Sequence, residues 1–174
     1  YEEVLAIGYK GIMEKAEKEL ASIKVTDADY IKKSRFLEAV IISCKAACNH
    51  AKRYAALAKE KASKESDIMR KNELLKIAEN CERVPENGAR NFYEACQSFW
   101  FVQMLLQTES SGHSISPGRF DQYMYPYYAA DLEKGVITRE FAQELIDCIW
   151  VKLNDLNKVR DAASAEGFAG YSLF

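Results

Sequence analysis

One stretch divides this sequence: Ser110-Ser111-Gly112-His113-Ser114-Ile115-Ser116-Pro117-Gly118-Arg119-Phe120-Asp121-Gln122-Tyr123. It consists largely of small, polar and turn-forming residues, and it holds His113, one of the two histidines in the chain. Gly112 and the pair Pro117-Gly118 are typical of turns. Binding and catalytic residues often lie on such loops between rigid elements. We therefore predict a loop here that carries functional side chains.

Helical periodicity dominates on both sides of this loop. We expect helices over about residues 2–22, 28–64, 67–83, 89–108 and 139–157. The segment 89–108 is apolar nearly all round, which is typical of a helix central to a core. We expect N-caps at Thr26 or Asp27 and at Thr138. Strand signals are weak, so the chain is predicted to be mainly α, with about five or six helices.

Two further details concern packing and the residues after the loop. An aromatic stretch that ends at Tyr128 is interrupted by Pro126 and precedes the last helix.

The long helix over residues 28–64 is expected to bury an apolar face that includes Ile31, Phe36, Val40, Ile41, Cys44, Ala47, Tyr54 and Leu57.

Composition narrows the class of protein. The chain has 174 residues, of which 48% are hydrophobic and 29% charged, as in ordinary globular domains. Its net charge of −2 argues against a nucleic-acid partner, and its apolar runs are too short for a membrane span. We expect a cytoplasmic protein. Because the sequence opens at Tyr1 within a helical pattern and closes at Phe174 on an apolar run, we expect an internal fragment of a longer polypeptide.

Cysteine usage favours reduced, buried thiols. An odd number of cysteines without secretory context is typical of a cytosolic protein. Cys44 and Cys48 lie one helical turn apart with His50 nearby, but His50 points away from Cys44, so we predict no metal site. The five cysteines are Cys44, Cys48, Cys81, Cys96 and Cys148.

His113 is the strongest candidate for chemistry. With the neighbouring hydroxyl of Ser114, its imidazole can bind a substrate hydroxyl and exchange a proton with it. The structural alternative is a surface histidine that caps a helix. The aromatic residues Tyr123 to Tyr128 are more typical of a core or an interface than of a ligand site.

The loop and its surroundings resemble a known family. The segment Gly112 to Tyr128 resembles the corresponding segment of glycyl radical enzymes, the pyruvate formate-lyase-like superfamily. The segments Phe92 to Gln97, Ala142 to Asp161 and Tyr1 to Ile12 agree in register, so the resemblance covers essentially the whole chain. It implies one partial pyruvate formate-lyase-like domain over residues 1–174, truncated at both ends. It also implies that these helices and this loop form outer helices and a substrate loop of a larger β/α barrel.

Within the superfamily the chain is most similar to B12-independent glycerol and 1,2-propanediol dehydratases. The resemblance implies that His113 and Ser114 contact substrate, and that the parent enzyme cleaves a C–O bond of a small diol by thiyl-radical chemistry. Ser111 stands where the dehydratase pattern often has Asn. Isethionate sulfite-lyases, which cleave a C–S bond, share much of the segment, and a formate acetyltransferase-type homologue is a further alternative. A non-catalytic helical interaction module is the alternative from another class.

The resemblance also implies parts that the chain lacks. The family uses a catalytic Cys and a glycyl radical, an organic radical that a radical SAM activating enzyme installs, in anaerobic metabolism. Since no cysteine here lies in a Gly-Cys-x-Glu context, we expect no catalytic residue, bound cofactor or metal in this chain, and no activity from it alone. The expected partners are a small-molecule substrate, the activating enzyme and a second copy in a full-length homodimer, with neither nucleic acid nor membrane.

Overall fold

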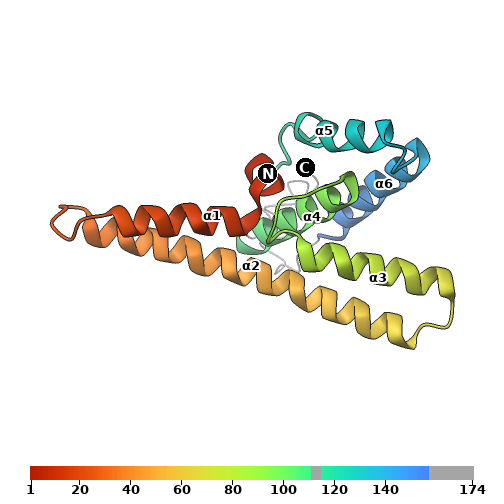
Figure 1. Ribbon diagram of the computed structural model, residues 1–174, viewed down its shortest axis with the longest axis horizontal. Helices are drawn as coiled ribbons and strands as arrows, with labels where there is room; N and C mark the ends of the chain where they lie inside the picture. The colour runs from red at the N-terminus through yellow and green to blue at the C-terminus, as the bar shows by residue number, and fades with distance from the viewer. Residues whose placement is uncertain (111–114, 157–174) are drawn as a thin grey trace, which may run out of the picture. The chain divides into compact units, whose positions relative to one another are not determined.

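The computed structural model describes residues 1–110 and 115–156 (Figure 1). The regular elements in these ranges are all α-helices, which confirms the mainly α prediction for the described residues. They are α1 (Glu2–Ser22), α2 (Tyr30–Lys64), α3 (Ile68–Arg83), α4 (Phe92–Glu109), α5 (Phe120–Glu133) and α6 (Arg139–Asp155). None of these helices is both long enough and apolar enough to cross a membrane. The chain forms two compact units, one of residues 2–89 and one of Tyr1 with the residues from Arg90 onward.

Side-chain caps begin three of the helices. The predicted cap at Thr138 is confirmed, since its hydroxyl accepts a hydrogen bond from the Phe141 N–H at 3.1 Å. Asp67 caps α3 and Asn91 caps α4 in the same way, each at 2.8 Å. The expected cap at Thr26 or Asp27 is wrong. α2 follows Asp29 without a side-chain cap, because backbone turns over residues 24–30 lead into its first turn.

The aromatic stretch after the loop is itself a helix, α5, although Pro126 lies inside it. Proline removes one hydrogen bond of the helical ladder and usually bends or ends a helix. Here packing outweighs that local cost: Met124 is buried, and Tyr128 packs edge-on against Phe92 with ring centroids 5.7 Å apart. Contacts between distant residues therefore allow a helix to form over a stretch in which Pro126 argued against one.

In the unit of residues 2–89, α2 packs against both α1 and α3 (Figure 1). The predicted apolar face is partly wrong, because Ile31 and Phe36 are 73% and 67% exposed, and Tyr54 and Leu57 are also exposed. Small side chains at alternating spacings of three and four residues form the buried stripe, which lets the neighbouring helices approach closely. The stripe contains Ile41, Cys44, Cys48, Ala51, Ala55, Ala58 and Ala62.

A kink at Gly8 shapes the start of α1. Gly8 has φ 68° and ψ 175°, outside the helical region. The backbone of residues 85–89 lies against the kink: Pro85 and Glu86 carbonyls accept from the N–H groups of residues 9 and 10, and the Ala89 N–H donates to the carbonyl of residue 5, each at 2.8 Å. Gly8 and Gly88 both face backbone so closely that a Cβ on either would overlap a carbonyl group. The crossing therefore requires glycine on both sides.

Substitution of the two crossing glycines tests this packing. We expect Gly8→Ala and Gly88→Ala each to destabilise the crossing by at least about 2 kcal/mol, from overpacking and, at Gly8, from a strained positive φ. The matched control is Gly135→Ala, since Gly135 has φ 65° but open space around its Cβ position and should lose only about 1 kcal/mol. The measurement is hydrogen exchange of the amides of residues 9, 10 and 89 in the full-length protein. Equal exchange in the Gly8 and Gly135 variants would contradict the packing.

Candidate functional site

The two predicted substrate-binding residues, His113 and Ser114, lie outside the described residues. The structure describes both ends of their loop. On one side α4 closes at Ser110, whose N–H donates to the Leu106 carbonyl at 3.0 Å. On the other side residues 115–119 lead into α5. The site is therefore built from the side chains that hold these ends, and we call residues 115–117 the loop stem.

Gln103 of α4 holds the loop stem from one side. Its side-chain nitrogen Nε2 donates to the Ile115 carbonyl at 2.9 Å, and its oxygen Oε1 accepts from the Tyr1 hydroxyl. Gln107, one turn further along α4, reaches the same Ile115 carbonyl at 3.5 Å. Gln103 is only 1% exposed, and a buried amide is costly unless its groups are paired. Its partners are a tyrosine hydroxyl and the backbone of the loop stem.

Tyr123 of α5 holds the stem from the other side. Its hydroxyl donates to the Pro117 carbonyl at 2.8 Å. Its ring stacks on Tyr1, with centroids 5.7 Å apart and planes 8° from parallel. Phe99 packs against both Tyr1 and Phe120, at centroid distances of 5.3 and 4.8 Å. We call Tyr1, Phe99, Phe120 and Tyr123 the aromatic cluster; it fixes both phenols that serve the stem.

Both phenols stay protonated over the ordinary pH range. Burial raises the pKa of Tyr1 above its usual value, and it raises the pKa of Tyr123 further, with a contribution from the neighbouring Tyr1 phenol. A protonated phenol can donate a hydrogen bond, whereas a phenolate can only accept one. The bonds from Tyr1 to Gln103 and from Tyr123 to Pro117 therefore persist at neutral pH.

A buried carboxylate ties α5 to α4 away from the loop. The Asp131 carboxylate, 4% exposed near the end of α5, accepts from the Phe92 N–H at 2.7 Å. Glu94, fully buried in the first turn of α4, pairs with Arg90 at 2.5 Å. A free N–H at a helix start is satisfied here by a carboxylate, which also suits the helix dipole. The Asp131–Phe92 contact therefore joins α5 to α4 away from the loop, whereas the Arg90–Glu94 pair is local to the start of α4.

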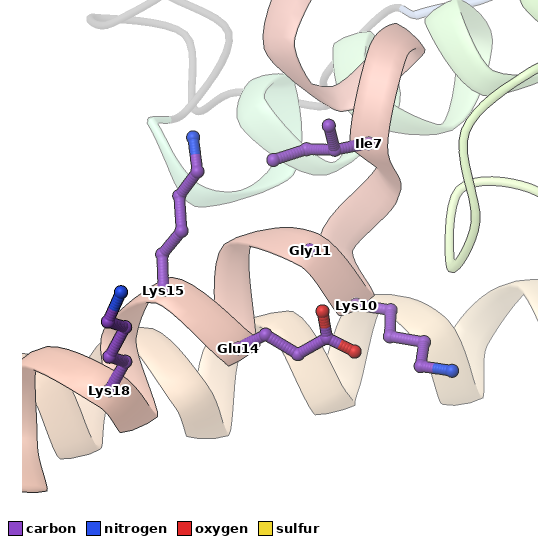
Figure 2. Close-up of a pocket in the computed structure, with 6 residues that line it drawn as sticks. All are labelled: Ile7, Lys10, Gly11, Glu14, Lys15 and Lys18. Carbon is purple, nitrogen blue, oxygen red and sulfur yellow. The ribbon is translucent and has the colours of Figure 1, made fainter.

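The unit of residues 2–89 has a hollow of about 470 Å³ on α1 (Figure 2). Its lining carries one carboxylate and three lysines, of which Lys15 forms an ion pair with Glu3 at 2.7 Å. Glutamate and lysine side chains can take part in acid–base chemistry, but none of the lining residues is one that the sequence predicted for the site. The lining residues are Ile7, Lys10, Gly11, Glu14, Lys15 and Lys18.

The buried cysteines of the described residues are poor nucleophiles. Cys44, Cys48, Cys81 and Cys96 are buried and free, and only Cys148 is exposed. Burial raises the pKa of the Cys81 and Cys96 thiols to about 12, so both stay protonated at neutral pH. Within residues 1–110 and 115–156, no cluster of three or more His, Cys, Asp or Glu side chains could hold a metal ion.

The whole chain, residues 1–174, matches the pyruvate formate lyase-like family, and the chain belongs to that family. A solved protein concerned with 1,2-propanediol dehydration in Roseburia inulinivorans is 66% identical over 99% of the chain, with a TM-score of 0.95. The B12-independent glycerol dehydratase from Clostridium butyricum, solved with glycerol bound, is 54% identical over 100% of the chain, with a TM-score of 0.93. The isethionate sulfite-lyase of Desulfovibrio desulfuricans is 50% identical over 87% of the chain.

The chain spans about a fifth of the length of each of these relatives: 21%, 22% and 18% respectively. The expected resemblance to glycyl radical enzymes is confirmed, and so is the expected similarity both to diol dehydratases and to isethionate sulfite-lyases. The sequence-based prediction did not identify Gln103, Tyr1 or Tyr123 as supports of the loop. For Gln103 a signal was present, because it is a lone amide within the apolar run of α4.

Alkaline titration tests the contacts of the aromatic cluster. Because the folded protein raises the pKa of Tyr123, the protonated phenol stabilises the fold fully below the ordinary tyrosine pKa of about 10. That stability is lost as the pH rises through the raised pKa. Near-ultraviolet absorbance of phenolate should show a late-titrating tyrosine that disappears in Tyr123→Phe. The control is Tyr125→Phe, since Tyr125 is 64% exposed. A late tyrosine that survives in Tyr123→Phe and disappears in the control would contradict this assignment.

Proposed function

We propose that the protein containing this chain is a glycyl radical lyase that removes water from a small diol, glycerol or 1,2-propanediol, and that the chain contributes its substrate loop. The observation that carries this proposal is the pattern of identity: 66% and 54% to the two dehydration proteins over nearly the whole chain, against 50% over 87% of it for the sulfite-lyase. Residues 1–174 would then form part of one pyruvate formate-lyase-like domain, among the outer helices of a β/α barrel.

In this proposal His113 and Ser114 bind and orient the substrate hydroxyl groups. A neutral imidazole and a serine hydroxyl each donate and accept hydrogen bonds, so together they can fix both the position and the polarity of a diol. Loss of a hydroxyl group as water requires a proton at the departing oxygen, and a positioned donor lowers the barrier for that transfer. The fixed carbonyls of Ile115 and Pro117 support this role, because they anchor the backbone two and four residues after His113.

The remaining chemistry belongs to parts of the protein outside this chain. A glycyl radical, installed by a radical SAM activating enzyme, would supply the hydrogen-atom abstraction that starts the reaction. None of the cysteines here is proposed to take part, because four are buried as protonated thiols or small core residues and none lies in a Gly-Cys-x-Glu context. The proposed whole protein is a cytoplasmic homodimer, and this chain alone is proposed to be inactive.

A sulfite-lyase acting on isethionate is the second candidate. The 50% identity to the Desulfovibrio desulfuricans enzyme favours it specifically. The identities to the two dehydration proteins are higher and extend over more of the chain, which supports the diol reaction over C–S cleavage. A formate acetyltransferase or a helical interaction module has no comparable support among these relatives.

A substrate comparison separates the two candidates. The activated full-length protein should convert 1,2-propanediol or glycerol to an aldehyde, and it should release little sulfite from isethionate. The measurement is aldehyde formation beside sulfite release under anaerobic conditions, with unactivated protein as the control. Sulfite release from isethionate, with no aldehyde from either diol, would replace the first proposal by the second.

Replacement of the loop histidine tests the proposed site. His113→Ala should lower kcat/KM for the diol by about 10²-fold or more, the usual contribution of a positioned acid–base group. Its glycyl radical content, measured by electron paramagnetic resonance, should match that of the wild type. The control is His50→Ala, which replaces the other histidine of the chain, in α2. Wild-type turnover in His113→Ala would remove His113 from the site.

A further inference from the structure

Gln103 is an unusual residue for its place in the fold. Its neighbours in sequence from Phe99 to Leu106 are all apolar or aromatic, and its side chain is 1% exposed. An amide in such surroundings costs free energy unless its hydrogen-bonding groups are paired. Its pairing reaches residue 1 at one end and the loop stem at the other, so Gln103 joins three segments that are distant in sequence.

The Ile115 carbonyl determines the direction of both hydrogen bonds of Gln103. A backbone carbonyl can only accept a hydrogen bond, so the Gln103 amide must turn its nitrogen toward Ile115. Its oxygen then faces the Tyr1 hydroxyl, which must donate. The orientation is therefore unique: Tyr1 donates to Gln103, and Gln103 donates to the Ile115 carbonyl.

We propose that Gln103 is a positioning residue for the substrate loop, acting through its hydrogen bond to the Ile115 carbonyl. The inference rests on the proposed function, since it assigns Gln103 to the support of His113 and Ser114. Ile115 is two residues from His113, a span of at most about 7 Å of chain, so the position of the stem limits where His113 can lie. Misplacement of a reacting group by about 1 Å can cost about 10²-fold in rate.

The contact from α5 makes the anchoring two-sided. Tyr123 holds the Pro117 carbonyl at 2.8 Å while Gln103 holds the Ile115 carbonyl at 2.9 Å. Pro117 itself has no N–H, and its ring limits the backbone rotation between the two held carbonyls. Gln103 is the anchor nearer to His113 along the chain, so its loss should alter the loop more than the loss of the Tyr123 hydroxyl.

The primary test is Gln103→Met in the full-length protein. This substitution keeps the length and flexibility of the side chain but removes both the N–H donor and the carbonyl acceptor of its amide. We expect kcat/KM for 1,2-propanediol to fall at least about tenfold, and hydrogen exchange of residues 115–119 to rise. The ratio of kcat/KM for the two enantiomers of 1,2-propanediol should also change. A purely structural role would reduce the amount of active protein and leave that ratio unchanged. The matched control is Gln143→Met, at an exposed glutamine of α6.

A second variant keeps the inference testable if the first folds poorly. Gln103→Glu has nearly the shape of the wild type, but its ionised carboxylate cannot donate to the Ile115 carbonyl. Protonation restores a donor, so the activity of Gln103→Glu relative to wild type should rise as the pH is lowered. Gln143→Glu should show no such change in relative activity.

The outcomes distinguish this inference from the proposed function. If wild-type protein dehydrates the diol and folded Gln103→Met retains its kcat/KM and enantiomer ratio, the inference is overturned while the proposed function stands. A proportional loss for both enantiomers, with unchanged exchange in residues 115–119, also overturns it. If wild-type protein instead releases sulfite from isethionate, the proposed function fails. In that case KM and kcat for isethionate, with the same exchange measurement, decide the role of Gln103.

Discussion

Where the backbone departs from a regular helix, its N–H and carbonyl groups need other hydrogen-bond partners. This constraint shapes both units of the chain. An unpaired buried N–H or carbonyl costs about 1–3 kcal/mol. In the unit of residues 2–89, the kink at Gly8 is accommodated because the backbone of residues 85–89 pairs with both sides of it. In the other unit, the loop stem is accommodated because Gln103 and Tyr123 pair with its carbonyls. The same requirement gives a crossing of two backbone segments in one unit and a held loop stem in the other.

The pairing at the Gly8 kink and the pairing at the loop stem require different residues in the sequence. At the kink the pairing is backbone to backbone, so the sequence need only leave space, and glycine does so at positions 8 and 88. At the loop stem the pairing uses side chains, so the sequence must place an amide and a phenol at fixed positions on α4 and α5. A loop held by side chains can be adjusted by single substitutions, which suits the substrate-binding role that we propose for it.

Much of the fold could be predicted from hydrophobic periodicity and capping residues. Long amphipathic patterns locate α1, α3 and α6, and Thr138 marks the start of α6. Most of the buried stripe of α2 could not be predicted from large apolar residues, because all of its members except Ile41 are alanines and cysteines, while Ile31 and Phe36 remain exposed. Pro126 concealed α5, since the packing that outweighs its local cost involves residues distant in sequence, such as Phe92.

The candidate site shows the same division. The chemistry of the loop and a family resemblance are enough to propose His113 and Ser114, whereas the contacts that hold the loop stem join residues as distant as 1 and 103. Our central claim is that this loop places His113 on the substrate while Gln103 holds its stem. A crystal structure of the full-length protein with 1,2-propanediol bound tests it most directly. We predict the His113 imidazole within hydrogen-bonding distance of a diol hydroxyl and Gln103 Nε2 on the Ile115 carbonyl. A diol bound away from His113, or a stem free of Gln103, would contradict the account.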